Sequence, residues 1–285
     1  MFSSFQKQAK VIIIVILLHR MQALPYRGTT SDFYRHTQNV ILKKPMKVWE
    51  GNPDRASLEK TNAEAIEIER QILQMLGKHP RIVPLIGFNS DGIYLSEARL
   101  GNLQAYIDTH NAELSPSQRS GICEQIADAI VYTHKMGVVH SDLRPENILV
   151  DQVDASSLSV WLCDFGGSTC EGLGLDGGHL PDTPFFDPRM KWESTPATDI
   201  FSLGSIFYTI QTGLWPFRDR PPLWSSVEEK QAYEAQVDAW FKNGYFPSVS
   251  HITGGNVIKG CWDHEYKSAE EVLKAVRVEM VASLL

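Results

Sequence analysis

The sequence has few cysteines and no long apolar run. Its four cysteines lie far apart, without the paired spacing of a metal site or of a small disulfide framework. Such cysteines are typical of reduced thiols in an intracellular protein. The longest uninterrupted apolar run, residues 11–18, is too short for a bilayer-spanning helix, which takes about 20 residues.

Positive charge is also scarce. The chain has 27 Lys and Arg residues against 34 Asp and Glu residues, a formal net charge of −7, with no basic stripe and no repeat of fixed period. Because proteins that bind nucleic acid usually gather positive charge on one face, we expect no nucleic-acid partner. The 285 residues suffice for two compact regions with a sizeable core.

Two polar motifs stand out against this background. One reads HSDLRPEN and ends at Asn147, and the other reads DFG and begins at Asp164. The first motif also holds a carboxylate, Asp142, and a cation, Arg144. A lone Asp is most often a turn residue or a helix cap. Four polar groups in this order and spacing favour a functional site instead.

This order closely resembles the catalytic core of eukaryotic protein kinases, in which HRDxKxxN is followed by DFG. The resemblance implies that Asp142 accepts the proton of a substrate hydroxyl and that Arg144 lies beside the transferring phosphate, where the family usually has lysine. It also implies that Asn147 and Asp164 hold Mg²⁺, which oxygen ligands suit. ATP and Mg²⁺ are therefore the expected cofactors.

The resemblance extends from about Leu24 to the C-terminus and implies an α+β, bilobal protein kinase fold. An antiparallel β N-lobe with one key helix is expected at residues 24–97, and a mainly α C-lobe at residues 98–285. Residues 1–23 are then an N-terminal extension that contains the short apolar run.

The strand that ends in the ATP-anchoring lysine of the family is similar to the segment VILK, which ends at Lys43. Lys44 follows immediately. The three residues before Lys43 are all apolar, so alternation does not decide which lysine points inward. The family register favours Lys43.

A helix is predicted at residues 57–76, where apolar residues recur at helical spacing. Glu69 lies within it at the position where the family places the carboxylate partner of the strand lysine. Glu64 and Glu67 are rival carboxylates, for which a solvated helix face is the simpler interpretation.

The nucleotide loop has a single glycine, Gly28, where the family pattern GxGxxG has three. Glycine allows backbone amides to approach phosphates closely, because it imposes no side-chain barrier. If the resemblance holds here, Thr29, Thr30 and Ser31 offer hydroxyls to phosphate. A lone glycine before these residues is also a common turn.

The hinge between lobes is expected after the strand IYLS. Ser96 then occupies the gatekeeper position, and the backbone from Glu97 to Arg99 is expected to bind the adenine edge.

Three further positions of the C-lobe resemble structural residues of the family. Thr183 resembles the threonine that contacts the catalytic Asp and Lys, and Asp199 resembles the residue that fixes the catalytic loop, although an N-cap role is also open. Arg189 replaces the glutamate of APE, so the usual ion pair cannot form. A charge-swapped pair of Arg189 with Glu270 or Glu271 is a hypothesis.

The function implied is an ATP- and Mg²⁺-dependent serine/threonine protein kinase, because Pro145 and Glu146 differ from tyrosine-kinase patterns. Ser141 replaces the arginine that normally receives an activation-loop phosphate, so activation by loop phosphorylation is not expected. The alternative is a pseudokinase that serves as a nucleotide-binding or protein-binding scaffold. It is supported by the single glycine of the nucleotide loop and by Ser141 and Arg189. A small-molecule kinase of the aminoglycoside phosphotransferase type typically lacks the LxPEN and DFG detail.

The apolar run fits the length of a signal-peptide core, but Met21-Gln22-Ala23 is a poor cleavage site. We therefore favour a helix packed on the N-lobe or an extension that is not ordered, and the sequence leaves these two open. The expected protein is a cytoplasmic monomer that acts on a protein substrate, without a membrane partner.

Overall fold

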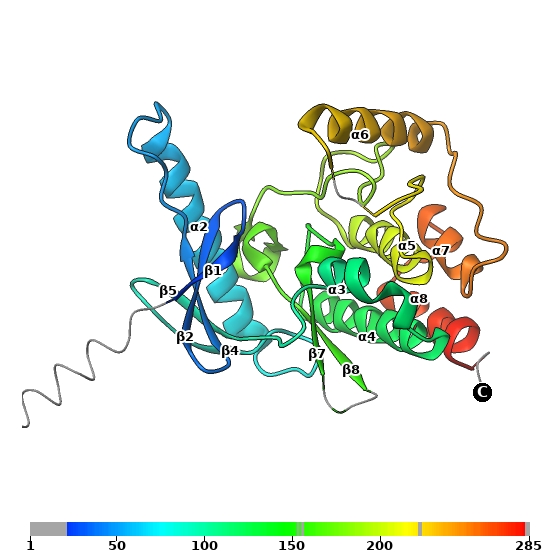
Figure 1. Cartoon of the computed structure of the whole chain (residues 1–285), viewed down its shortest axis with the longest axis horizontal. Helices are drawn as coiled ribbons and strands as arrows, with labels where there is room; N and C mark the ends of the chain where they lie inside the picture. Colours follow the sequence, from blue (N-terminus) through cyan, green and yellow to red (C-terminus); the bar gives the residue numbers. More distant parts are fainter. Residues whose placement is uncertain (1–21, 153, 155–156, 222–223, 283–285) are drawn as a thin grey trace, which may run out of the picture. The chain divides into compact units, whose positions relative to one another are not determined.

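The structure is a computed structural model that describes residues 22–152, 154, 157–221 and 224–282 (Figure 1). The predictions for residues 11–18 therefore lie outside the described residues. The described residues divide into two compact units, one containing those up to 66 together with residues 85–97, the other containing residues 67–84 and the described residues from 98 to 282.

Residues 67–84, which the sequence analysis assigned to the N-lobe, thus group with the larger unit. The physical reason is a set of contacts within that unit. The amide of Val83 donates to the carbonyl of Leu162 at 2.9 Å. The hydroxyl of Tyr132 donates to the carbonyl of Leu76.

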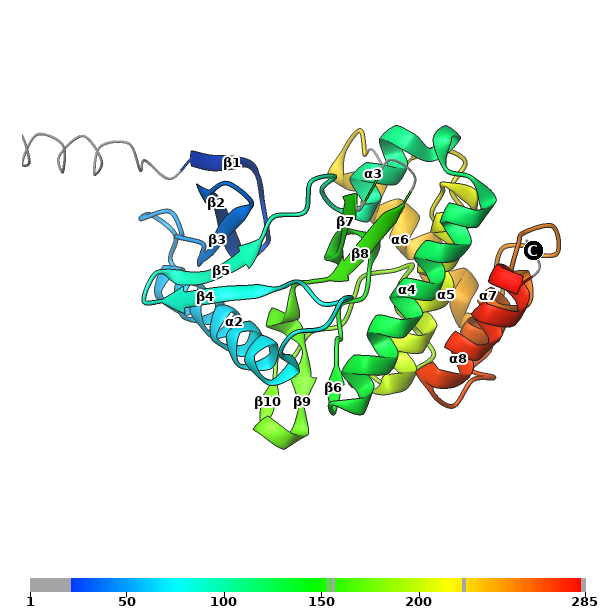
Figure 2. The ribbon, with the colours of Figure 1, turned by 90° about the horizontal axis from the view of Figure 1, so that it is seen from below.

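The smaller unit contains an antiparallel sheet, five-stranded over the described residues, with strand order β1-β2-β3-β5-β4 (Figure 2). The strands are β1 (Gln22–Arg27), β2 (Ser31–Thr37), β3 (Val40–Pro45), β4 (Leu85–Asn89) and β5 (Gly92–Ser96). The central strand β3 is well buried: its middle residues Ile41, Leu42 and Lys43 are all buried.

Helix α2 (Arg55–Leu76) begins two residues before the predicted start. The side chain of Asn52 accepts a hydrogen bond from the amide of Asp54 at 2.8 Å, which forms the turn that leads into the helix. Its second half buries Ile72, Leu73 and Leu76, as the helical spacing of these residues predicts.

The larger unit is mainly helical and includes short strands. Its helices are α3 (Leu103–His110), α4 (Pro116–Lys135), α5 (Pro196–Thr212), α6 (Val227–Lys242), α7 (Gly255–Trp262) and α8 (Ala269–Val276), which continues as a π-helical turn (Arg277–Val281). Its 3₁₀ turns are Asn111–Glu113, Pro145–Asn147, Phe165–Gly167 and Glu171–Leu173. Its strands are β6 (Val138–Val139), β7 (Ile148–Gln152), β8 (Leu158–Leu162), β9 (Thr169–Cys170) and β10 (Leu175–Asp176). Strands β7 and β8 pair with each other, and β9 lies between β10 and β6.

Helix α4 has a well-defined start. Ser115 and Gln118 form a reciprocal capping box, and Pro116 occupies the first turn, where its missing amide hydrogen is not needed. The helix leads through β6 directly into the HSDLRPEN segment, so the position of this segment follows from the packing of α4.

Helix α5 forms the centre of the larger unit, where it packs against α4 and α7 (Figure 2). Gly204 allows the close approach of α7, since a Cβ atom there would lie 2.9 Å from a ring carbon of Trp262. The Trp262 ring nitrogen donates to the Ser205 hydroxyl at 3.0 Å, and this hydroxyl donates to the carbonyl of Pro184 at 2.6 Å. Together, these units confirm the predicted α+β architecture.

Candidate active site

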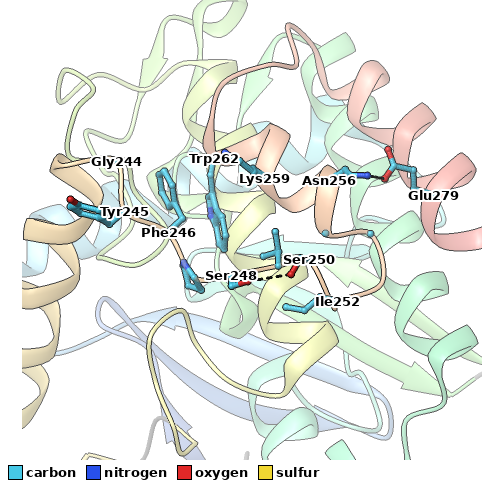
Figure 3. A pocket seen from close by; sticks show the side chains of 14 residues that line it. Gly244, Tyr245, Phe246, Ser248, Ser250, Ile252, Asn256, Lys259, Trp262 and Glu279 are labelled. Carbon is cyan, nitrogen blue, oxygen red and sulfur yellow. Dashed lines mark hydrogen bonds between the residues drawn. The ribbon is translucent and has the colours of Figure 1, made fainter.

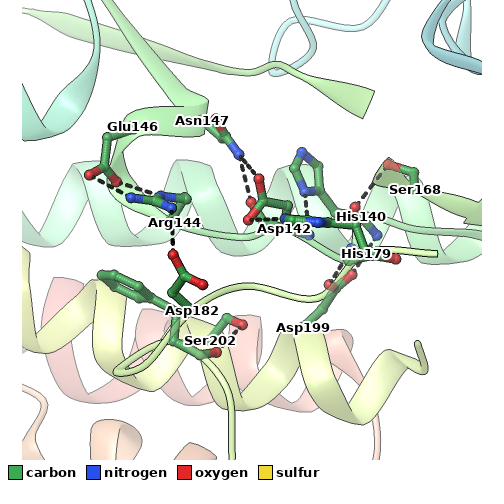
Figure 4. A network of polar contacts seen from close by, with 12 residues as sticks. His140, Asp142, Arg144, Glu146, Asn147, Ser168, His179, Asp182, Asp199 and Ser202 are labelled. Carbon is green, nitrogen blue, oxygen red and sulfur yellow. Dashed lines mark hydrogen bonds and ion pairs between the residues drawn. The ribbon is translucent and has the colours of Figure 1, made fainter. Parts of the chain in front are cut away.

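A buried carboxylate anchors the segment between β6 and β7 (Figure 4). Asp199, only 1% exposed in the first turn of α5, accepts hydrogen bonds from the backbone amides of His140 at 2.8 Å and Ser141 at 3.0 Å. The Nε2 atom of His134, in α4, lies 2.9 Å from the same carboxylate. The start of the HSDLRPEN segment is therefore tied to both α4 and α5.

Two residues in this region have left-handed backbone conformations. Ser141 has φ 69° and Asp164 has φ 65°. Asp adopts this conformation more readily than most residues with a Cβ atom, whereas for other residues it costs roughly 1–2 kcal/mol. The Ser141 hydroxyl donates to the carbonyl of Val139 at 3.2 Å and contacts the hydroxyl of Ser194. These contacts help to hold the turn that immediately precedes Asp142.

The side chain of Asn147 orients Asp142. Its amide nitrogen donates both to the carboxylate Oδ2 and to the backbone carbonyl of Asp142, each at 2.8 Å (Figure 4). The two ends of the loop are therefore joined, and one oxygen of the Asp142 carboxylate already has a hydrogen-bond donor.

His179 lies over the other oxygen of this carboxylate. Its Nε2 atom is 3.5 Å from Oδ1 of Asp142. Burial raises the pKa of Asp142, but His179 and Arg144 lower it by more, so this pKa lies below its usual range. Contact with the Asp142 carboxylate in turn raises the pKa of His179.

Arg144 is held by carboxylates on two sides. Its Nε and Nη2 atoms donate to Glu146, each at 3.0 Å, and its Nη1 atom lies 3.9 Å from Asp182. Burial lowers the pKa of Arg144, but the fork to Glu146 and the nearby Asp142 and Asp182 raise it by more. The guanidinium is therefore a fixed positive charge beside Asp142.

Asn147 and Asp164 are brought together by the pairing of β7 with β8. The amide of Cys163 donates to the carbonyl of Asn147 at 3.0 Å, and Asp164 is the next residue. An amide oxygen and a carboxylate suit Mg²⁺, which keeps several waters and binds phosphate oxygens. Among the described residues, no cluster of three or more His, Cys, Asp or Glu could hold a metal ion. A Mg²⁺ ion at Asn147 and Asp164 would therefore need ligands from water and nucleotide.

Comparison with known proteins agrees with this geometry. The protein kinase domain family matches residues 34–267. The chain belongs to the protein kinase family. The matched region includes both motifs and the residues that anchor them, so the bilobal kinase fold predicted from the motifs is confirmed.

Several serine/threonine kinases are similar to this kinase domain. A probable serine/threonine-protein kinase, gdt4, of Dictyostelium discoideum is 31% identical over 61% of this chain and 11% of its own length. Ribosomal protein S6 kinase alpha-3 of Homo sapiens is 31% identical over 68% of this chain and 27% of its own length. Ribosomal protein S6 kinase alpha-6 of Homo sapiens is 33% identical over 72% of this chain and 26% of its own length. The chain thus spans about a tenth to a quarter of these relatives.

The two candidate lysines, Lys43 and Lys44, differ in burial. Lys43 is 3% exposed in β3, and its Nζ lies 5.8 Å from the centre of the Phe33 ring. The Lys44 side chain is 28% exposed and lies 3.5 Å from Asp91. The burial of Lys43 favours it as the inward lysine. Glu69 is fully buried in α2, within the larger unit.

The predicted glycine loop is a short turn between β1 and β2. The amide of Gly28 donates to the carbonyl of Ser31 at 2.9 Å, and the amide of Met46 donates to the carbonyl of Thr30 at 2.8 Å. Ser31 is buried, and its hydroxyl lies 3.3 Å from that of Thr30, whereas Thr29 is exposed. A Cβ atom at Gly28 would make only ordinary contacts, so this turn does not require glycine.

The predicted hinge residues already make hydrogen bonds within the kinase domain. Ser96 ends β5 opposite Val40. The amide of Glu97 donates to the carbonyl of Asn39 at 2.9 Å, and the Glu97 carboxylate pairs with Arg35. In the larger unit, the amide of Arg99 donates to Asp151 at 3.2 Å. The amides of Glu97 and Arg99 are therefore engaged in the structure.

The expected role of Thr183 stays a prediction. Among the described residues, no hydrogen bond joins its hydroxyl to Asp142 or Arg144. His179 and Asp182 contact these two residues instead. The sequence analysis missed both, because they follow a glycine-rich stretch whose path cannot be derived from residue spacing.

The charge-swapped pair proposed for Arg189 is wrong. The Arg189 guanidinium donates to Asp187 at 2.8 Å and to the carbonyl of Trp262 at 2.9 Å. Glu270 pairs instead with Lys135, and Glu271 accepts from the amide of Lys267. The reason is local: only Pro188 separates Asp187 from Arg189, so the two side chains meet directly.

A cavity of about 570 Å³ lies beside this anchor, away from Asp142 (Figure 3). The stacked rings of Phe246 and Trp262, 5.1 Å apart, form part of its wall. The Arg189 guanidinium lies 5.1 Å from the centre of the Phe246 ring. Its lining residues lie between Gly244 and Trp262 and at Glu279, outside both the catalytic loop and the segment that follows DFG.

The described residues contain no helix that is both long and apolar enough to cross a membrane.

Proposed function

We propose that this kinase domain transfers the γ-phosphate of ATP, with Mg²⁺, to serine or threonine hydroxyls of a protein substrate. The observation that carries the proposal is the constellation of Asp142, Asn147 and Asp164, which the loop and the β7-β8 pair bring together. The serine/threonine kinases to which the chain is similar support the substrate class. Lys43 and Glu69, both buried, are proposed as the pair that anchors ATP.

In the proposed reaction, the hydroxyl oxygen of the substrate forms a bond to the γ-phosphorus. The bond from this phosphorus to the β,γ-bridging oxygen breaks, and that oxygen leaves with ADP. Asp142 accepts the hydroxyl proton, for which its lowered pKa keeps it ionised. Arg144 contributes a fixed positive charge next to the acceptor.

Asn147 and Asp164 are proposed to hold Mg²⁺, which neutralises phosphate charge when it is bound. The turn of Gly28, Thr29, Thr30 and Ser31 is proposed to lie near the phosphates. Of its three hydroxyl residues, Thr29 is the best placed to offer a hydroxyl, because Ser31 is buried against Thr30. Ser96 and the backbone from Glu97 to Arg99 are proposed to bind the adenine.

We further propose that the protein acts as a monomer in the cytoplasm, on a protein substrate. The second candidate function is a pseudokinase scaffold. It is favoured by the burial of the Asp142 Oδ1 atom and by a phosphate loop in which the single glycine is not required by its surroundings.

Phosphate transfer from labelled ATP tests the first function against the second. Asp142→Asn should abolish transfer to the protein itself and to a generic basic substrate, because the variant lacks the proton acceptor. Asp238→Asn, on α6, is the matched control and should transfer as the wild type does. Equal transfer by wild type and Asp142→Asn would reject the catalytic assignment, and no transfer by either would favour the scaffold.

Nucleotide binding provides a separate test of the metal site. Asp164→Ala should weaken Mg²⁺-dependent ATP binding, whereas Asp142→Asn should bind ATP nearly as the wild type does. Titration of each variant with a fluorescent ATP analogue, once in the presence of Mg²⁺ and once in EDTA, measures the nucleotide affinity and its dependence on Mg²⁺. Equal Mg²⁺ dependence in Asp164→Ala and wild type would exclude Asp164 as a metal ligand.

A further inference from the structure

The carboxylate of Asp142 has one oxygen that the proposed function leaves unexplained. Oδ2 accepts a hydrogen bond from Asn147, whereas Oδ1 is buried and has no hydrogen-bond partner among the described residues. A buried carboxylate oxygen without a donor is unfavourable, since it has lost its water without replacement. The imidazole Nε2 atom of His179 lies 3.5 Å from it.

The position of His179 is set by a tight contact between two glycines. A Cβ atom at Gly177 would lie 2.4 Å from the carbonyl carbon of Gly167, so only glycine fits there. The amide of Gly177 donates to the carbonyl of Ser168 at 3.0 Å. A Cβ atom at Gly167 would lie 2.9 Å from the Cβ of His179. The segment is therefore packed on the turn that follows Asp164, and His179 is directed at Asp142.

A second contact lies three residues further along the same segment. Asp182 is 3.9 Å from Arg144 (Figure 4). It also lies 3.5 Å from Lys230, a residue of α6. Asp142 and Arg144, which both belong to the catalytic loop, are thus each contacted by a side chain from one segment, His179 and Asp182 respectively.

We propose that His179 occupies the place of the substrate hydroxyl on Asp142, so that the segment of residues 177–182 competes with the substrate for the catalytic loop. The inference rests on the proposed kinase function. A hydroxyl must reach Asp142 to transfer its proton, and Oδ1 is covered in this structure. Phosphate transfer therefore requires that His179 moves away, and Asp182 releases Arg144 in the same movement.

The surroundings of His179 favour its contact with Asp142. The pKa of His179 is raised by Asp142 from the catalytic loop and by the charges of Asp182 from its own segment and Asp164 from the start of the DFG turn. Arg144 and Lys230 lie 3.9 Å and 3.5 Å from one of them, Asp182. Three acidic groups thus attract the imidazole, and its half-exposed side chain remains open to displacement by a bound protein substrate.

The first test is the effect of His179→Ala on transfer to a serine peptide. Because a partly exposed ion pair is worth up to about 1 kcal/mol, its loss should raise kcat/KM for the peptide about two- to fivefold. The increase should come mainly from a lower KM for the peptide. His251→Ala, at an exposed histidine, is the matched control and should leave kcat/KM unchanged. His179→Lys keeps a cation and should remain near the wild-type value.

A purely structural role for His179 predicts the opposite result, namely a lower kcat/KM and a lower melting temperature in His179→Ala. That outcome, or an unchanged kcat/KM, would overturn the inference.

The contact itself is tested without catalysis. In an NMR titration of the full chain, the His179 imidazole should titrate above an ordinary histidine, and Asp142→Asn should lower its pKa. An ordinary pKa that Asp142→Asn does not change would overturn the inference even in an active kinase. If the NMR result is as expected but no variant transfers phosphate, the proposed function fails while the covering contact stands.

Discussion

Two buried carboxylates of the larger unit, Asp199 and Asp187, anchor two different loops by different means. Both are 1% exposed. Asp199 holds the catalytic loop chiefly through the backbone amides of His140 and Ser141. Asp187 holds the segment after DFG chiefly through side chains, those of Arg189 at 2.8 Å and His264 at 2.7 Å, and it also accepts a hydrogen bond from the backbone amide of Arg189 at 2.9 Å.

The difference decides which sequence changes each anchor tolerates. Backbone amides are present whatever residues occupy positions 140 and 141, so the first anchor depends on one carboxylate alone. The second depends on three side chains, each of which can change. This explains how the domain keeps an anchored segment although Arg189 replaces the usual glutamate: Asp187 supplies the carboxylate, and Arg189 and His264 are its side-chain partners.

The largest effect is expected for Asp199→Ala. The change leaves two buried amides and His134 without their acceptor, which should lower the free energy of unfolding by about 3 kcal/mol or more. Phosphate transfer should fall more than about 100-fold, because the loop that carries Asp142 loses its anchor. Urea unfolding and transfer from labelled ATP measure the two effects. Wild-type stability in Asp199→Ala would refute the single-carboxylate anchor.

Asp187→Ala should cost less, about 2 kcal/mol. It removes the partner of Arg189 and His264, but both side chains are about one-third exposed and can be solvated by water. Urea unfolding measures this loss in the free energy of unfolding, with Asp238→Ala as the control for loss of a carboxylate at the surface. A larger loss than in Asp199→Ala would reverse the comparison.

The Asp187 anchor should also weaken in acid. Burial raises the pKa of Asp187, but His264 and Arg189 lower it by more, to about 2. A carboxyl whose pKa is lower in the folded state stabilises the fold above its unfolded pKa of 3.8, and this contribution is lost as the pH falls from there towards 2. Unfolding followed from pH 5 to pH 2 should show this loss in the wild type and a smaller one in Asp187→Asn. If the stability of the wild type and of Asp187→Asn fell equally with pH, the contribution of the Asp187 carboxylate would be refuted.

The smallest effect is expected for Arg189→Lys, about 1 kcal/mol. Lysine keeps the charge beside Asp187 but loses the forked contact, the hydrogen bond to the carbonyl of Trp262 and the packing over Phe246. Thermal unfolding measures the change. Arg189→Glu should be clearly worse than Arg189→Lys, because it places two carboxylates together, and equal melting temperatures would argue against the pair.

The two anchors also differ in how far the sequence predicts them. Asp199 stands in a segment, TDIFSLG, whose order of residues points to the start of a buried helix. For Arg189 the sequence offered distant glutamates, whereas the actual partner is two residues away and the second, His264, lies far along the chain. Opposite charge alone does not identify the carboxylate that pairs with Arg189, because the strength of an ion pair depends on the distance between the two groups, which the sequence does not give.

The sequence by itself determined the kinase fold, the α2 helix and the order of Asp142, Arg144, Asn147 and Asp164, because these depend on hydrophobic periodicity and on residues close together in the chain. Only the tertiary structure decided that Lys43 rather than Lys44 is buried, and that His179 and Asp182 contact the catalytic loop. The first depends on the twist and pairing of β3, and the second on a contact between Gly167 and Gly177. Contacts of this kind depend on the path of a glycine-rich segment, and neither composition nor spacing encodes that path.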